Sequence, residues 1–397
     1  MSIALLTGPQ GESALALAAE QPDPGSVQAA TRLRARFSPE LATAALHQEA
    51  LRRRAAAKFG DRARHLLFTA DGIEQATRAE VSRWRFARLR SSGITHLLDL
   101  GCGIGADALA ALDAGLQVVA VELDPDTAAC ARHNLALADA GARLVEGDAT
   151  ALLEGLLAEM PADTTAILVD PARRTARGRS WRLEDLSPPW SFVTDLVVAG
   201  RPTVVKLGPG IYRGLLPPVP TSHVSHAGAA VETTLWSGFG GLLPVEAVVI
   251  DRGGVVNTLG GDHPRDAPLG PLAAFVHEPD PALSRAQLVT ALADDLVQLD
   301  VGAGYFSSDA ALDGPFMTSF RVIEVLEART KTLKQWVRSH DVGTLEIKKR
   351  GSGGLLDTDP AELRRTLAPR GTRTATLVLA RVQGHVRALY VERAAVA

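Results

Sequence analysis

A glycine-rich turn that follows a buried strand most narrows the folds open to this chain. Residues 97–105 read LLDLGCGIG, so an apolar run ends in three alternating glycines and continues into a helical stretch. Glycine allows a sharp turn and a close approach of the backbone to a bound molecule, and the helix that follows exposes free N–H groups. The turn therefore predicts a strand–turn–helix unit with a ligand site at its bend.

Short apolar runs alternate with helical stretches after this turn. Strands are expected at residues 96–100, 117–122, 143–146, 166–169 and 203–206, and helices lie between them, as at 106–114 and 126–138. Strands rich in Val, Ile and Leu that alternate with helices predict a doubly wound parallel sheet. Two later runs, 232–237 and 245–250, are expected to complete the sheet as an antiparallel pair.

The predicted fold class is α/β: a doubly wound, Rossmann-like sheet with a helical N-terminal region and a small α+β C-terminal domain. The length of 397 residues is enough for two or three domains. The expected boundaries are a helical region at 1–90, the sheet domain at 91–255, a linker and helical connection at 256–318, and the α+β domain at 319–397.

Local signals place some element ends. Ser38, which is followed by Pro and Glu, is expected to cap a helix, and Thr77 with Glu80 fits a capping box. Residues 251–270 are rich in Gly, Pro and Asp, so we expect a linker or long loop there. A helix is expected over roughly residues 281–297.

Cysteine and histidine usage argue against several classes of protein. The two cysteines, Cys102 and Cys130, cannot form a disulfide framework or a cysteine-based zinc site. The ten histidines lack convincing metal-ligand spacing. The N-terminus resembles no signal peptide, and no run of 18 apolar residues exists. We therefore expect a cytoplasmic protein without a metal or a membrane span.

The charge is unevenly distributed along the chain. The total is −3, but residues 1–30 carry −3, residues 31–90 carry +8, residues 91–320 carry −15 and residues 321–397 carry +7. An acidic middle between two basic blocks suggests a polyanionic partner for the flanks. A composition bias toward Arg is the alternative, since only 6 of the 42 basic residues are Lys, but it does not explain where they cluster.

Carboxylates stand at the ends of successive predicted strands. Asp99 precedes the first glycine, Glu122 ends the second strand, Asp148 follows the third, and Asp170 with Pro171 follows the fourth. The glycine spacing alone also fits a dinucleotide-binding enzyme. A dinucleotide-binding enzyme has no particular use for Asp99 or Asp170. A carboxylate after the second strand, such as Glu122, can accept hydrogen bonds from both ribose hydroxyls.

Together these four motifs resemble those of class I S-adenosylmethionine-dependent methyltransferases, over roughly residues 90–250. The resemblance implies S-adenosyl-L-methionine as cofactor. It also implies a role for each matching residue: Asp99, Gly101, Gly103 and Gly105 hold the methionine part, Glu122 and the adjacent Leu123 the ribose, Asp148 and Ala149 the adenine, and Asp170 and Pro171 line the place where methyl donor and acceptor meet.

The C-terminal tail resembles a second module. Residues 346–351 (EIKKRG), 363–367 (LRRTL) and 369–371 (PRG) are similar to the THUMP-like domain found at the C-terminus of bacterial methyltransferases. Residues 68–72 (FTADG), 74–77 (EQAT) and 278–281 (EPDP) also look like that family. THUMP domains are associated with RNA, which agrees with the +7 charge of residues 321–397.

The type of methyl transfer stays open between two acceptors. Neither cysteine lies where methylation of a pyrimidine carbon needs a nucleophile. For nitrogen, Asp170 followed by Pro can accept a hydrogen bond from an amine and aim its lone pair, although Ala172 and Arg173 replace the usual second Pro and aromatic residue. This is the preferred hypothesis.

The alternative acceptor is a ribose 2′-hydroxyl. Asp170, Lys206 and Glu232 resemble three members of the Lys-Asp-Lys-Glu set of ribose 2′-O-methyltransferases, in which a lysine helps to deprotonate the hydroxyl. The first lysine of that set is missing, because residues 59–205 contain none. An ion pair between Lys206 and Glu232 would be a purely structural explanation.

The predicted function is methylation of a base nitrogen in structured RNA, such as tRNA or rRNA, with the oligomeric state left open. The alternatives are a ribose 2′-O-methyltransferase, an RNA-binding protein with an inactive core, and a small-molecule methyltransferase. The expected catalytic residues are Asp170, Lys206 and Glu232. The residues expected to contact RNA are basic: Arg173, Arg174, Lys334, Lys348, Lys349 and Arg350.

Overall fold

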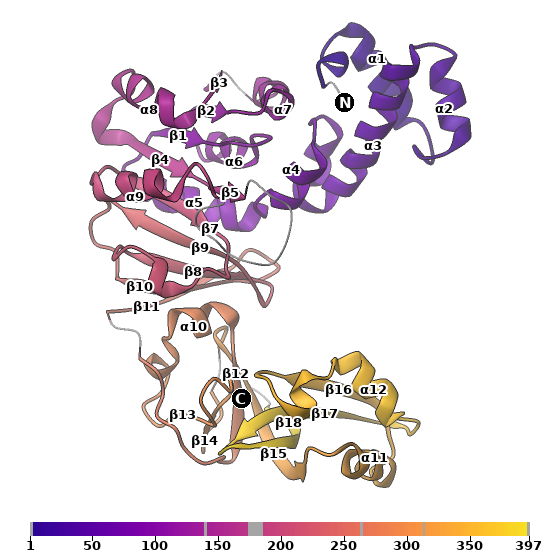
Figure 1. Ribbon diagram of the computed structural model, residues 1–397, viewed down its shortest axis with the longest axis vertical. Coiled ribbons are helices and arrows are strands. Elements are labelled where there is room, and N and C mark those ends of the chain that lie inside the picture. Colours follow the sequence, from indigo (N-terminus) through magenta and orange to yellow (C-terminus); the bar gives the residue numbers. More distant parts are fainter. Residues whose placement is uncertain (1–2, 139–140, 174–185, 263–264, 313, 395–397) are drawn as a thin grey trace. The chain divides into compact units, whose positions relative to one another are not determined.

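The computed structural model describes residues 3–138, 141–173, 186–262, 265–312 and 314–394 (Figure 1). The chain divides into two compact units, Met1–Pro220 with Thr233–Leu242, and Thr221–Glu232 with Leu243–Ala397. In the described ranges, no helix combines the length and the apolar character that a bilayer crossing requires.

The first unit is built on a mostly parallel sheet. Its strands are β1 (His96–Leu100), β2 (Gln117–Glu122), β3 (Ala142–Glu146), β4 (Thr165–Val169), β7 (Thr203–Leu207) and the last residues of β9 (Ala229–Ser237). They lie in the order β9-β7-β4-β1-β2-β3. All neighbouring pairs from β7 to β3 are parallel, and β9 is antiparallel to β7. The predicted doubly wound sheet is confirmed, and its chain reverses direction of winding between β1 and β4, where such sheets bind ligands.

Helices pack on this sheet because its central strands are apolar on both faces. The helices are α5 (Ala79–Ser91), α6 (Ala106–Asp113), α7 (Pro125–Ala136), α8 (Ala149–Ala158) and α9 (Trp190–Val198). Every residue of β4 is buried, and Ile167 shares a hydrophobic core with Leu153 of α8 and Val193 of α9. Burial of each such side chain is worth about 1.5–3 kcal/mol, which fixes the strand ends that carry the polar residues.

The N-terminal region is helical, as predicted. It holds η1 (Ile3–Leu6), α1 (Pro9–Ala19), α2 (Val27–Arg34), α3 (Pro39–Phe59), η2 (Gly60–Arg64) and α4 (Ala70–Gln75). Ser38 caps α3 by accepting from the Leu41 N–H. The predicted capping box of Thr77 and Glu80 is wrong: Arg78 is the N-cap residue of α5, with no side-chain cap, because the Thr77 hydroxyl bonds to a buried carboxylate instead.

The second unit contains strands that the sequence pattern did not predict. Two of these are β8 (Thr221–His226) and β11 (Val256–Gly261), which pair with β10 (Val245–Ile250) on its two sides. Three more, within residues 275–308, lie where the sequence predicted a linker and a helical connection. The expected pairing of residues 232–237 with 245–250 is therefore wrong, as is the loop over 251–270. β8 reads TSHVSH and is buried at all six positions. Because most of its residues are polar, no apolar pattern predicted a buried strand there. The expected helix at 281–297 shortens to α10 (Pro281–Ala286), which ends where Gln287 adopts a positive φ of 54°.

The rest of the second unit is an α+β structure, as expected. Its sheet order is β13-β14-β12-β15-β18-β17-β16. The strands are β12 (Phe275–Pro279), β13 (Val297–Gln298), β14 (Phe306–Ser308), β15 (Met317–Glu327), β16 (Val342–Lys349), β17 (Arg373–Val382) and β18 (His385–Arg393). The helices α11 (Thr330–Ser339) and α12 (Pro360–Leu367) share one hydrophobic core with β16 and β17, and Figure 1 shows α12 beside β16. Leu333, Trp336 and Val337 form the buried stripe of α11, as its sequence predicted.

Candidate active site

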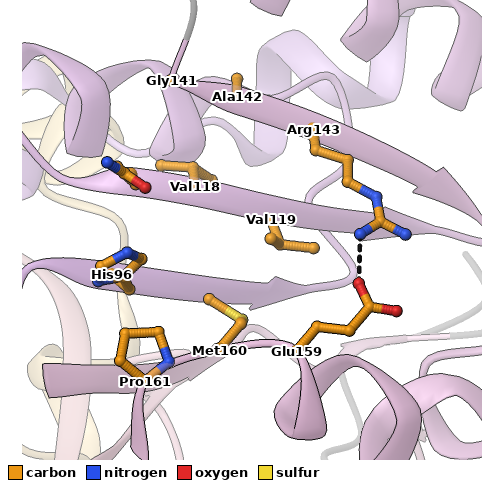
Figure 2. A pocket seen from close by; sticks show the side chains of 10 residues that line it. His96, Val118, Val119, Gly141, Ala142, Arg143, Glu159, Met160 and Pro161 are labelled. Atoms are coloured by element: carbon orange, nitrogen blue, oxygen red, sulfur yellow. Dashed lines mark hydrogen bonds and ion pairs between the residues drawn. The ribbon is translucent and has the colours of Figure 1, made fainter. Parts of the chain in front are cut away.

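A cavity of about 190 Å³ lies at the carboxyl edge of the parallel strands in the first unit. The predicted cofactor residues that line it are Gly101, Glu122, Leu123, Asp148 and Ala149, and they are joined there by Asp170. A second cavity, of about 350 Å³, lies at the amino edge, where the ion pair of Arg143 and Glu159 closes one side (Figure 2). None of the predicted site residues lines that second cavity. Predicted residues from four strand ends, those of β1, β2, β3 and β4, thus meet at one edge of the sheet.

The glycine turn has the conformation that its sequence predicted. Gly101 and Gly103 have φ angles of +82° and +58°, values that other residues rarely adopt. A Cβ added at either position would meet no atom within 4 Å, so open space adjoins the turn. Gly105 is the left-handed N-cap residue of α6. A bound molecule can therefore approach the backbone of this turn closely.

Glu122 accepts hydrogen bonds from both the glycine turn and the turn after β2. Its Oε2 accepts from the Gly103 N–H at 2.9 Å, and its Oε1 accepts from the Asp124 N–H at 2.9 Å. Asp148 caps α8 by accepting from the Thr150 N–H at 2.8 Å. Each carboxylate thus has a local structural role at the wall of the cavity.

Asp99 is the most unusual acid of the site. Its side chain is buried, and among the described residues its Oδ2 finds no hydrogen-bond partner. Burial, with the nearby negative charge of Asp107 as the second cause, raises the pKa of Asp99 to about 8. An unpaired buried carboxyl oxygen costs about 1–3 kcal/mol, so a ligand that brings a cationic donor would be held firmly there.

Lys206 and Asp170 meet at the ends of β7 and β4. The ammonium of Lys206 lies 2.5 Å from Asp170 Oδ2, 2.8 Å from Asp107 Oδ2 and 2.7 Å from the Thr77 hydroxyl. Asp170 is 38% exposed, whereas the side chains of Lys206 and Asp107 are 11% and 9% exposed. The lysine therefore joins a buried carboxylate to one that faces the cavity.

Asp107 is an ionised acid inside the protein. Burial alone would raise its pKa, but the charges of Lys206 and Arg85 outweigh burial and hold the pKa of Asp107 well below its ordinary value. Arg85 is fully buried and donates to Asp107 Oδ1 at 2.8 Å, as does the Ser82 hydroxyl. The position of Asp107 in the first turn of α6 adds a favourable helix dipole.

Asp107 and Arg85 were not among the residues expected at the site. Both are buried, and they form an ion pair. The available signal was Asp107, a charged residue inside the apolar helical run ADALAALD, which indicates a buried partner of opposite charge. Sequence alone could not pair the two, because they are 22 residues apart.

The site was also expected to include Glu232, Arg173, Arg174 and Pro171. Glu232 is a buried residue of β9 and belongs to the second unit. Arg174 lies outside the described residues, and of Arg173 only its backbone, in the short strand β5 (Ala172–Arg173), is described. Pro171 is buried directly after Asp170.

The basic residues at the end of β16 are engaged within the second unit. Lys348 contacts Glu278 at 2.8 Å, and Lys349 donates to the carbonyls of Leu356 and Thr358. Arg350 donates to the Pro279 carbonyl at 2.8 Å. These bonds join the EIKKRG and EPDP motifs to each other, so both motifs have a structural role. Lys334 lies half-buried on α11.

No group of three or more metal-ligating side chains occurs within the described ranges. The cavity at the carboxyl edge is lined by residues that include Gly101 and Gly147, the carboxylates of Glu122 and Asp148, and Asp170, which is paired with Lys206. These groups suit an organic ligand that carries a cationic amino group, hydroxyls and a flat ring.

Family models match three parts of the chain. Residues 97–169 match a methyltransferase domain, residues 317–393 match a THUMP domain-like family, and residues 1–55 match a domain of unknown function. The first match covers the glycine turn and the strand that precedes Asp170. The second covers α11, α12 and the strands β15 to β18.

Relatives and a solved structure match almost the whole chain. Two proteins of Mycobacterium tuberculosis, the uncharacterized S-adenosylmethionine-dependent methyltransferases MT3122 and Rv3037c, are each 32% identical to it over 368 residues, which is 88% of this chain and 95% of theirs. The crystal structure of a "putative methyltransferase" from Porphyromonas gingivalis W83 has the same fold, with a TM-score of 0.75 and 22% identity over 97% of this chain and 99% of that one. The chain belongs to the class I S-adenosylmethionine-dependent methyltransferases that carry a C-terminal THUMP-like domain, and S-adenosylmethionine is its cofactor.

Proposed function

We propose that this methyltransferase acts on a nitrogen of a base in structured RNA. One observation carries the choice of nitrogen: the ammonium of Lys206 lies between two carboxylates, Asp107 and Asp170, beside the Asp-Pro motif that ends β4. The THUMP-like domain supports RNA as the substrate class.

The residues that line the cavity, with Asp99 and Gly103 beside Gly101 in the same turn, fit the cofactor. Asp99 would accept from the amino group of its methionine part, and the open space beside Gly101 and Gly103 would take the backbone of that part. Glu122 and Leu123 would flank the ribose, and Asp148 with Ala149 would flank the adenine. The cofactor supplies an electrophilic methyl group on a sulfonium; the protein supplies the alignment.

Asp170 is the residue proposed to aim the acceptor. Its carboxylate is partly exposed at the cavity and is held by Lys206 at Oδ2, so it can accept a further hydrogen bond from an exocyclic or ring N–H. A hydrogen bond to an N–H turns the nitrogen lone pair toward the methyl group, which is catalysis by positioning. The buried Pro171 fixes the backbone that follows.

The surroundings of Lys206 disfavour the ribose alternative. A lysine that deprotonates a hydroxyl must give up its own proton readily, and nearby carboxylates oppose this because they stabilise the ammonium. Lys206 has two such carboxylates within 2.8 Å. We therefore propose Lys206 as a fixed cation and Asp170 as the residue that contacts the acceptor.

The test is to incubate the purified protein with S-adenosylmethionine labelled in its methyl group and total RNA from a strain that lacks the gene. Digestion to nucleosides and mass spectrometry should find the label on a base nitrogen of one RNA class. Asp170→Ala should give no labelled nucleoside. A label on the ribose would contradict the choice of nitrogen, and label only in a small-molecule extract would contradict RNA.

A second prediction concerns the basic face of α11. Lys331 and Arg338 are exposed on this helix and Lys334 is half-buried, whereas Lys348 and its neighbours are engaged internally. Replacing Lys331, Lys334 and Arg338 by Ala should weaken RNA binding and lower the slope of log K against log salt by about 2–3. Filter binding at several salt concentrations measures this slope. A matched variant, Glu362→Gln with Asp357→Asn, should leave it unchanged; an unchanged slope in the triple variant would remove α11 from the RNA surface.

A further inference from the structure

The carboxylate of Asp107 is surrounded by hydrogen-bond donors from α5, β7 and the segment between α4 and α5. Its Oδ1 accepts from Ser82 and Arg85 of α5, each at 2.8 Å. Its Oδ2 accepts from Thr77 at 3.0 Å and from Lys206 of β7 at 2.8 Å. Four donors saturate a carboxylate, so this side chain has a single orientation.

The fixed orientation of the Asp107 carboxylate in turn restrains the ammonium of Lys206. An ammonium has three N–H donors, and the oxygens within 2.8 Å of Lys206 Nζ include those of Thr77, Asp107 and Asp170. Two of these oxygens are fixed within the protein, since Asp107 is buried and the Thr77 hydroxyl itself donates to Asp107. The remaining N–H therefore points in a defined direction, toward Asp170.

Asp170 needs this restraint because it is the most exposed member of the chain of contacts. A partly exposed Asp side chain samples several rotamers, and a displacement of 1 Å at a reacting centre can cost about 100-fold in rate. The ammonium of Lys206, which does not line the cavity, contacts Asp170 Oδ2 at 2.5 Å and so favours one rotamer of that side chain.

From this geometry we propose that Asp107 is a positioning residue for methyl transfer, which acts through Lys206 to fix the carboxylate of Asp170. The proposal rests on the proposed role of Asp170 as the residue that aims the acceptor. It assigns a function to the buried charges of α5 and α6, which are not in contact with the cofactor cavity.

Asp107 has a second effect that can be measured without any acceptor. The groups that act on Asp99 are Asp107 of α6, Asp170 after β4, Lys206 of β7 and Arg85 of α5. The two acids raise the pKa of Asp99, and the two cations lower it. Neutralising Asp107 removes one negative charge and leaves both cations, so the pKa of Asp99 must fall.

The experiment compares Asp107→Asn with Asp113→Asn, which removes an exposed acid from the same helix. Transfer to total RNA should fall about 100-fold or more in Asp107→Asn and stay unchanged in the control. Calorimetry with S-adenosylhomocysteine should show affinity within about threefold of the original at pH 9. The pH at which that affinity levels off should move down by about one unit in Asp107→Asn only.

A milder variant covers the case in which Asp107→Asn does not fold. Thr77→Val removes the hydroxyl that bridges Lys206 and Asp107 but changes no charge, so transfer should fall about 5- to 10-fold with an unmoved pH profile. The proposal would be overturned if Thr77→Val transfers methyl groups normally and Asp107→Asn either does the same or does not fold. If the original protein transfers nothing to RNA, the substrate proposal fails, and the pH profile still decides for or against the electrostatic link of Asp107 to the site.

Discussion

The affinity for S-adenosylhomocysteine should rise steeply with pH and reach a plateau above pH 8. In the free protein the pKa of Asp99 is about 8, chiefly because the group is buried, so near pH 6 its carboxyl is protonated. A cationic amino group binds the ionised form, and binding must then release a proton. Below the plateau, affinity should change by about tenfold per pH unit. Isothermal titration calorimetry between pH 6 and pH 9 measures this dependence.

Asp99→Asn should remove both the affinity and its pH dependence. A neutral amide cannot pair with the ammonium, so affinity at pH 8.5 should fall about 100-fold or more. The matched control is Asp126→Asn, which neutralises an exposed acid of α7 without changing the cavity. An affinity that is independent of pH, or full affinity in Asp99→Asn, would show that Asp99 does not hold the cofactor.

The same substitution should stabilise the protein in the absence of cofactor. Because the folded pKa of Asp99 lies above the ordinary value of 3.8, the folded state binds the proton more tightly than the unfolded state. The stability that results is fully present below about pH 4 and is lost as the pH rises through 8. Asp99→Asn avoids this loss, so its melting temperature should exceed the original by about 2–4 °C at pH 8.5.

The sequence predicted the cofactor side of the site more completely than the catalytic side. Asp99, Glu122 and Asp148 stand at strand ends, and a parallel sheet brings the carboxyl ends of its strands to one edge. The local sequence pattern was therefore enough to predict that these three acids lie at the same edge of the sheet. The role of Lys206 could not be read in this way, because its partner Asp107 comes from a helix 99 residues earlier in the chain and was absent from the expected set.

The β-strands of the second unit show a related limit. β8 carries Ser and His at positions where buried strands usually carry Val or Ile, and its Ser222 bonds to Glu246 on β10. Side-chain hydrogen bonds across the sheet replace apolar packing there, and no periodicity of hydrophobic residues signals it. By contrast, α11 was predicted correctly because Leu333, Trp336 and Val337 follow the helical spacing.

Lys206→Arg should retain measurable methyl transfer, whereas Lys206→Met should lose about 1000-fold or more. A guanidinium remains charged and can still bridge Asp107 and Asp170, although its fork cannot copy the three short contacts of the ammonium. Methionine removes the cation that Asp107 and Asp170 share, so Asp170 loses its fixed orientation. Binding of S-adenosylhomocysteine should persist in both variants, which shows that they are folded.

The two substitutions separate a fixed cation from a general base. Arginine stays protonated at any accessible pH, so it cannot accept a proton from a hydroxyl. If Lys206 were the base of a ribose 2′-O-methyltransferase, Lys206→Arg would be as inactive as Lys206→Met. Lys334→Met, the same change on α11, controls for the loss of a lysine elsewhere and should leave the transfer step, measured at saturating RNA, unchanged. Residual activity in Lys206→Arg alone would assign the lysine to positioning and favour nitrogen as the methylated atom.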